Sequence, residues 1–136
     1  MKKLIYIFLL AAMFASCSST SESAPEPAES ALEAGREFVD ACLKGNFIRA
    51  KLYMLDNVAN EGLLADAEQK YRQLDRTERQ QYREASIIIE QQEAIDEKST
   101  IIYYKNSYDK EARKIKVVQQ GKEWLVDFAY TFNPNL

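Results

Sequence analysis

The sequence contains no histidine among its 136 residues. This absence removes the usual general base near neutral pH, the Ser-His-Asp and Cys-His arrangements, and most zinc or copper sites. The four glycines are isolated from one another, so there is no glycine-rich phosphate loop. A formal net charge of −3 gives no reason to expect nucleic-acid binding, which needs a clustered basic face. We therefore expect no metal or other cofactor and no common catalytic centre.

The chain also lacks an apolar run long enough for a membrane span. Its start is positive through Lys2 and Lys3, and the apolar run over residues 4–13 falls well short of the roughly 20 residues that a span needs. Such a pattern over residues 1–16 is typical of a secretory signal. The small residues Ala15 and Ser16 directly before Cys17 resemble a bacterial lipobox. That resemblance implies cleavage before Cys17 and lipidation of its thiol.

A lipidated Cys17 would hold the mature protein on a membrane, since two or more acyl chains anchor a protein stably. Cleavage would remove Lys2 and Lys3 and take the formal net charge from −3 to −5, so anionic headgroups would not attract the domain. Residues 17–29 comprise this cysteine and a segment rich in Ser, Glu and Pro, which predicts a flexible tether. In lipoproteins of the Bacteroidota an acidic pair behind the cysteine tends to mark surface export. Glu22 stands alone, so we expect an exported protein in the outer membrane facing the periplasm.

Cysteine is scarce as well, with Cys17 and Cys42 as the two examples. Once Cys17 is acylated, Cys42 has no partner for an internal disulfide, so the domain must be stabilised by its core. Cys42 fits a small buried hydrophobic residue better than a nucleophile.

Helical patterns occupy residues 30–83. Ser30 and Glu33 predict a capping box for a helix that runs to Lys44 and stops at Gly45. Asn46 is the expected cap of the next helix, and a third helix and a short capped turn follow. Their expected ranges are 47–55, 59–74 and 77–83. The apolar residues expected to face the core from the first two helices are Ala31, Gly35, Phe38, Val39, Cys42, Leu43, Ile48, Leu52, Tyr53 and Leu55.

From Ser86 the apolar period changes to two, which predicts strands. We expect four strands in succession, over residues 86–93, 100–106, 114–119 and 122–132. The last two carry alternating apolar residues: Ile115, Val117, Trp124, Val126, Phe128, Tyr130 and Phe132. A two-residue turn at Gln120-Gly121 would pair Ile115 with Val126, Val117 with Trp124 and Lys114 with Asp127. Helices followed by consecutive strands predict one α+β domain over residues 30–133 with an antiparallel meander.

Four segments of the chain resemble a family of small bacterial lipoproteins that contain a domain of unknown function. They are Ala31–Phe38, Lys44–Phe47, Ile101–Ser107 and Gly121–Phe128. That family belongs to the cystatin-like, or nuclear transport factor 2-like, superfamily. The resemblance implies a curved four-stranded sheet around a long first helix, forming a cone whose mouth often holds an apolar ligand. Relatives include isomerases, dehydratases, nonenzymatic binding domains and accessory modules, so the fold alone does not choose a function.

Enzymes of this superfamily can use an aspartate on a pocket-lining strand as a base beside a tyrosine. Asp127 with Tyr103 or Tyr104 is the matching candidate group, and a buried carboxylate with a raised pKa could abstract a proton next to a carbonyl. The expected register offers a simpler alternative, an ion pair between Asp127 and Lys114 across two strands.

Aromatic residues supply the candidates for ligand binding: Trp124, Tyr104 and Tyr130. A lone tryptophan on the apolar face of a hairpin is usually a core residue, whereas several tyrosines together could line a cavity. We expect a noncatalytic module, tethered through Cys17, that binds a small apolar ligand or an envelope protein. One alternative is a lyase or isomerase that uses Asp127 with a tyrosine. Another is a structural partner in an envelope complex, for which a dimer is one of the open oligomeric states.

Overall fold

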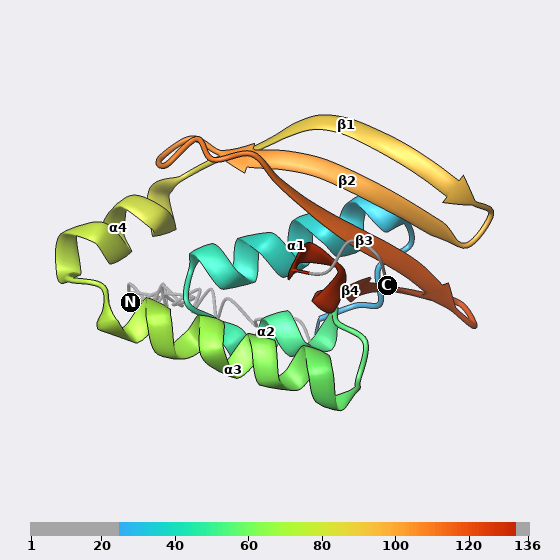
Figure 1. Cartoon of the computed structure of the whole chain (residues 1–136), viewed down its shortest axis with the longest axis horizontal. Helices are drawn as coiled ribbons and strands as arrows, with labels where there is room; N and C mark the ends of the chain where they lie inside the picture. The colour runs from blue at the N-terminus through green and yellow to red at the C-terminus, as the bar shows by residue number, and fades with distance from the viewer. Residues whose placement is uncertain (1–24, 133–136) are drawn as a thin grey trace, which may run out of the picture.

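The computed structural model describes residues 25–132 and shows helices followed by strands, as expected for an α+β chain. The predicted signal sequence and the predicted lipidation site, Cys17, lie outside the described residues. Figure 1 shows the sheet arching over α1, with α2 and α3 on the other side of α1. The elements are α1 (Ala31–Leu43), α2 (Phe47–Leu52), α3 (Val58–Gln73), α4 (Arg76–Glu84), β1 (Ile87–Asp96), β2 (Ser99–Asn106), β3 (Arg113–Gln120), β4 (Glu123–Asp127) and α5 (Ala129–Phe132).

Local caps explain where the first helix begins and ends. The Ser30 hydroxyl accepts a hydrogen bond from the backbone N–H of Glu33 at 3.2 Å, which confirms Ser30 as the cap. The Glu33 carboxylate accepts from the N–H of Glu29 at 2.8 Å instead of from Ser30, so the return contact lies one residue earlier than expected. Gly45 has a φ of 72°, a left-handed conformation that glycine adopts without strain, and the chain leaves the helix there.

Two of the helical expectations are wrong in detail. The second helix stops at Leu52, and its apolar residues Ile48 and Leu52 point to solvent, with 84% and 54% of their surfaces exposed. Phe47 and Ala50 face the core in their place. The fourth helix begins earlier than expected, because Asp75 and Glu78 form a complete capping box in which each carboxylate accepts from the other residue's backbone N–H.

The four strands form one antiparallel sheet in the order β1-β2-β3-β4, as the meander predicts. β1 continues to Asp96, past its expected end, and its pairing with β2 shifts register twice. Such irregularities increase local twist and bending in a strand. In Figure 1 these two strands curve over the length of α1.

The register of the last hairpin differs from the expected one by two residues. Gly121 and Lys122 form the turn, and Gly121 takes a φ of 61°. The observed pairs include Lys116–Asp127, Val117–Val126 and Gln119–Trp124. The predicted pairs Lys114–Asp127, Ile115–Val126 and Val117–Trp124 are therefore wrong. A shift of two leaves every side chain on its predicted face, because side chains alternate with a period of two.

The last strand also ends earlier than predicted, at Asp127, and residues 129–132 form the short helix α5. Two contacts explain the change. The segment at Met54 pairs in parallel with Val126 and occupies the outer edge of β4. The Asn60 side-chain oxygen accepts a hydrogen bond from the N–H of Ala129 at 2.7 Å and holds the chain as it turns. Phe132 is 59% exposed as a result and does not join the core.

The core lies between α1 and the concave face of the sheet. Its largest fully buried apolar side chains come from α1, β2, β3 and β4: Phe38, Ile102, Ile115, Val117 and Val126. Residues ahead of α1 join it too, since Ala28 is buried and the Tyr53 hydroxyl donates to the carbonyl of Glu26 at 3.3 Å. Among the described helices, none has the length and apolar character to cross a membrane.

Candidate ligand-binding pocket

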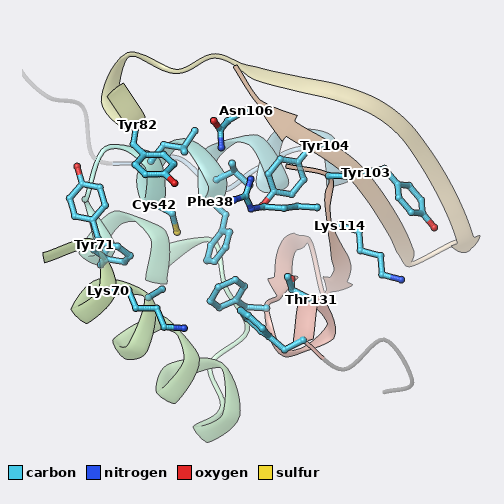
Figure 2. A pocket seen from close by; sticks show the side chains of 18 of the residues that line it. Phe38, Cys42, Lys70, Tyr71, Tyr82, Tyr103, Tyr104, Asn106, Lys114 and Thr131 are labelled. Carbon is cyan, nitrogen blue, oxygen red and sulfur yellow. The ribbon is translucent and has the colours of Figure 1, made fainter. Parts of the chain in front are cut away.

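A cavity of about 790 Å³ opens between α1, α3, α4, the sheet and α5. Figure 2 shows Phe38 and Cys42 facing it from α1, Tyr71 from α3 and Tyr104 from the sheet. Many of the lining residues are aromatic: Phe38, Phe47, Tyr71, Tyr82, Tyr103, Tyr104, Phe128 and Phe132. A concave, mainly apolar space of about 300–1,000 Å³ is typical of small-molecule sites.

The pocket has a buried floor and an exposed mouth. Phe38, Tyr104 and Phe128 are at most 9% exposed and form the floor, where the rings of Phe38 and Phe128 pack 5.0 Å apart between centroids. Lys70 and Phe132 line the cavity as well but are exposed. A ligand would therefore enter beside α3 and α5 and reach apolar surface deeper in.

Cys42 lines this pocket as a half-buried residue on α1. The apolar surroundings raise the pKa of its thiol to about 12, because burial penalises the thiolate. The thiol is thus protonated at neutral pH and contributes an apolar surface to the wall. That placement agrees with its expected character as a small buried hydrophobic residue.

The structure brings two of the sequence candidates into the pocket, Tyr103 and Tyr104. Burial raises the pKa of Tyr104 well above its ordinary value. Tyr103 is half-buried, and its hydroxyl donates to the Glu93 carboxylate at 3.0 Å, which raises its pKa further from neutrality. Both phenols remain protonated. The Tyr104 ring faces the pocket, whereas the Tyr103 ring points away from it (Figure 2), as expected for neighbouring residues of one strand.

The other three candidates lie elsewhere. Asp127 is half-buried at the end of β4 and does not line the pocket. Trp124 lines a separate cavity of about 180 Å³ beside residues 25–28. Tyr130 is buried outside the main pocket, with the ammonium groups of Lys114 and Lys116 lying 5.5 and 5.6 Å from the centroid of its ring. The expected grouping of Asp127 with a tyrosine in one cavity is absent.

A hydrogen-bonded cluster fixes the wall farthest from α5. The Asp109 carboxylate accepts from the Arg113 guanidinium at 2.7 Å, from the Asn106 amide at 3.0 Å and from the Tyr82 hydroxyl at 3.2 Å. The Arg113 contact in particular holds the pKa of Asp109 well below its usual range, against the opposing effect of burial. Since Tyr82 belongs to α4, this cluster ties α4 to the hairpin between β2 and β3.

Sequence reasoning missed most of the lining. Phe38 was expected on the core face of the first helix, but nothing in the pattern showed that a cavity would lie between it and the third helix. Lys70 and Thr131 were not singled out at all, because the first belongs to a charged helix face and the second to a predicted strand that ends early. No group of three acidic or cysteine side chains able to hold a metal ion occurs in residues 25–132.

Comparison with known proteins adds no relative: no protein-family model, no curated protein and no solved structure matches this chain.

Proposed function

We propose that this chain is an envelope lipoprotein, tethered to a membrane through Cys17, whose domain binds a small apolar ligand without catalysis. We further propose that the domain is a cone of the cystatin-like, or nuclear transport factor 2-like, type. The observation that carries the binding role is the aromatic-lined pocket of about 790 Å³. Apolar surface that is open to water at this scale favours ligand binding. Each methylene of a ligand that becomes buried there contributes about 0.8 kcal/mol to the free energy of binding.

The chemistry of the lining supports binding over catalysis. Asp127, the candidate base, lies outside the pocket, and the thiol of Cys42 is protonated at neutral pH. Glu90 is the carboxylate that lines the cavity, and its oxygen accepts a hydrogen bond from Lys105 at 2.6 Å. That carboxylate is therefore engaged by the Lys105 ammonium group and is not free in the cavity.

Filling the cavity provides the direct test. Ala67 lines the pocket from α3, while Ala65 on the same helix is exposed and outside the lining. Ala67→Phe should lower the affinity for the uncharged fluorescent probe N-phenyl-1-naphthylamine at least tenfold, because the new ring takes the space of the probe. Ala65→Phe adds the same ring to the outer surface and should leave the affinity unchanged.

Titration of the full-length chain with the probe, read by the rise in fluorescence, gives both affinities. Thermal unfolding of the two variants serves as the folding control. Equal probe binding by Ala67→Phe and the unmodified chain would show that the pocket is not the binding site.

The anchor is tested separately by metabolic labelling with an alkyne fatty acid. Label on the chain should disappear in Cys17→Ser and persist in Cys42→Ser, since only the first cysteine follows the lipobox-like residues. Persistent label in Cys17→Ser rules the anchor out. Membrane fractionation of the labelled cells then checks the proposed outer-membrane location.

A further inference from the structure

The tyrosines of the pocket differ in what their hydroxyl groups contact. The Tyr82 hydroxyl donates to a carboxylate at 3.2 Å, and the Tyr71 hydroxyl accepts from a guanidinium group at 3.2 Å. The Tyr103 hydroxyl donates to a carboxylate at 3.0 Å, on a ring that points away from the cavity. Each of these three hydroxyl groups is therefore engaged by the protein itself.

Tyr104 is the exception. Within residues 25–132 its hydroxyl group has no hydrogen-bond partner, although the residue is only 8% exposed. Among the described residues, the enclosed side-chain atom that lacks a partner belongs to Thr131, so the Tyr104 oxygen is not enclosed and keeps surface open to the cavity. Figure 2 shows the Tyr104 ring reaching from the sheet toward Phe38. The floor of the pocket thus carries an unengaged hydroxyl group.

This hydroxyl group is a hydrogen-bond donor beside a second donor. Burial keeps the pKa of Tyr104 well above its ordinary value, so the phenol holds its proton at neutral pH. Arg113, which can only donate, stands opposite Tyr104 in the pairing of β2 with β3. The nearby Asp109 carboxylate already accepts from three side chains. An oxygen atom that accepts and does not donate is therefore the group that fits here.

The charges around the cavity leave this place neutral. Glu90 and Arg113 each form an ion pair within the protein, at 2.6 and 2.7 Å. Lys114 directs its ammonium group to the Tyr130 ring, outside the pocket, and Lys70 is exposed. Among the described residues, no unpaired charge therefore lies at the floor. An ionised group of a ligand would lose its hydration there without compensation.

We propose that the ligand is an uncharged, mainly apolar molecule with a carbonyl group, and that the Tyr104 hydroxyl donates a hydrogen bond to the carbonyl oxygen. This inference rests on the proposed binding function and specifies the class and orientation of the ligand. The carbonyl group lies at the floor, and the apolar body extends past Phe38 and Phe128 toward the mouth at Phe132. A carbonyl oxygen brings no proton that would need an acceptor, whereas an alcohol does.

The test compares two fluorescent probes of one shape. Prodan is a dimethylaminonaphthalene with a propionyl group, and its analogue carries a propyl group in the same place, without the carbonyl oxygen. In the full-length chain, Tyr104→Phe should weaken prodan binding about fivefold and leave binding of the propyl analogue unchanged. The emission of bound prodan should also move to shorter wavelength in this variant, because hydrogen bonding to the carbonyl stabilises the excited state of prodan.

The controls separate the contact from a general disturbance. Tyr104→Phe keeps the ring and removes a hydroxyl group without a protein partner, so the unfolding midpoint should not fall. Tyr108→Phe removes the hydroxyl of a partly exposed tyrosine outside the pocket lining and should leave the affinities for both probes unchanged.

The outcomes are distinct. If Tyr104→Phe binds prodan as tightly as the unmodified chain does, with the same emission, the carbonyl contact is wrong while apolar binding stands. An equal loss of affinity for both probes also overturns the contact, since the propyl analogue has no oxygen to lose. If neither probe binds the unmodified chain, the proposed function itself is contradicted.

Discussion

At the scale of single residues, Asn60 connects parts of the chain that are far apart in sequence. It is fully buried at the start of α3. Its amide donates to the carbonyl of Leu55 at 3.2 Å and its oxygen accepts from the N–H of Ala129 at 2.7 Å. By satisfying two backbone groups, this side chain fixes the start of α5, which carries Thr131 to the pocket and follows directly after Phe128.

Asn60→Ala should therefore destabilise the protein by about 2–3 kcal/mol, because it leaves two buried backbone groups without partners. Asn57 is the helix cap three residues earlier, and its side chain bonds the N–H of Asn60 at 2.9 Å. Asn57→Ala removes an ordinary cap and should cost about 1 kcal/mol. Urea unfolding measures the loss of stability in both variants. If Asn60→Ala costs no more than Asn57→Ala, Asn60 does not hold the two buried backbone groups as described.

Asp109 makes stability depend on pH. Its pKa is lowered in the folded protein, mainly by Arg113, so its contribution is present above the unfolded pKa of about 3.9 and is lost as pH falls through the folded value. Asp109→Asn should cost about 1–2 kcal/mol at pH 7, allowing for solvent screening of the pair.

The difference between Asp109→Asn and the unmodified chain should shrink as the pH falls below about 4, where the aspartate of the unfolded chain begins to protonate while that of the folded chain stays charged. Urea unfolding over a pH series reads this directly. Glu111→Gln provides the control: this carboxylate also contacts Arg113, at 3.0 Å, but is 72% exposed and should matter little. A difference that stays constant down to pH 2 would count against the mechanism.

At the scale of elements, the link between α1 and α2 shapes the pocket. Gly45 has a φ of 72°, and a Cβ atom at this position would collide with the Tyr71 ring from α3. Tyr71 in turn packs edge-on against Phe47 with centroids 5.8 Å apart, and its hydroxyl accepts from Arg83 of α4 at 3.2 Å. The tight turn thus lets three helices meet around one pocket residue.

Gly45→Ala should cost about 2–4 kcal/mol, combining the strain of a positive φ with overpacking against Tyr71. Gly121 has a similar φ of 61° but open space around it. Gly121→Ala isolates the backbone strain and should cost about 1 kcal/mol. Thermal unfolding of the pair checks the difference, and equal costs would mean that the ring moves aside freely.

The periodicity of the sequence predicted most elements, because each depends on near neighbours. The cap at Ser30, the stop at Gly45 and the four successive strands are confirmed. The predicted end of β4 was wrong because contacts from other parts of the chain decide it. Asn60 bonds the N–H of Ala129, and the segment at Met54 pairs with Val126. A period of two in residues 124–132 carries no trace of those contacts.

At the scale of the whole molecule, the pocket itself could not be derived from local pattern. Its wall includes residues of α1, α3, α4, β2, β3 and α5. A cavity is the space that remains where side chains from different elements do not contact one another. Tyr103 and Tyr104 could be predicted as pocket residues from their strand. Lys70 and Thr131 could not, since a lysine on a polar face and a threonine in an expected strand look ordinary until the fold places them together.

The most direct test of an apolar ligand site is to find where such a ligand sits. The full-length chain is photolysed with an uncharged alkyl diazirine, and the modified peptides are mapped by mass spectrometry. Adducts should concentrate on Phe38–Leu43 of α1 and on Phe128–Phe132 and should fall sharply in Ala67→Phe. Adducts confined to the exposed apolar residues Ile48 and Val58, with none on α1, would contradict a ligand-binding pocket.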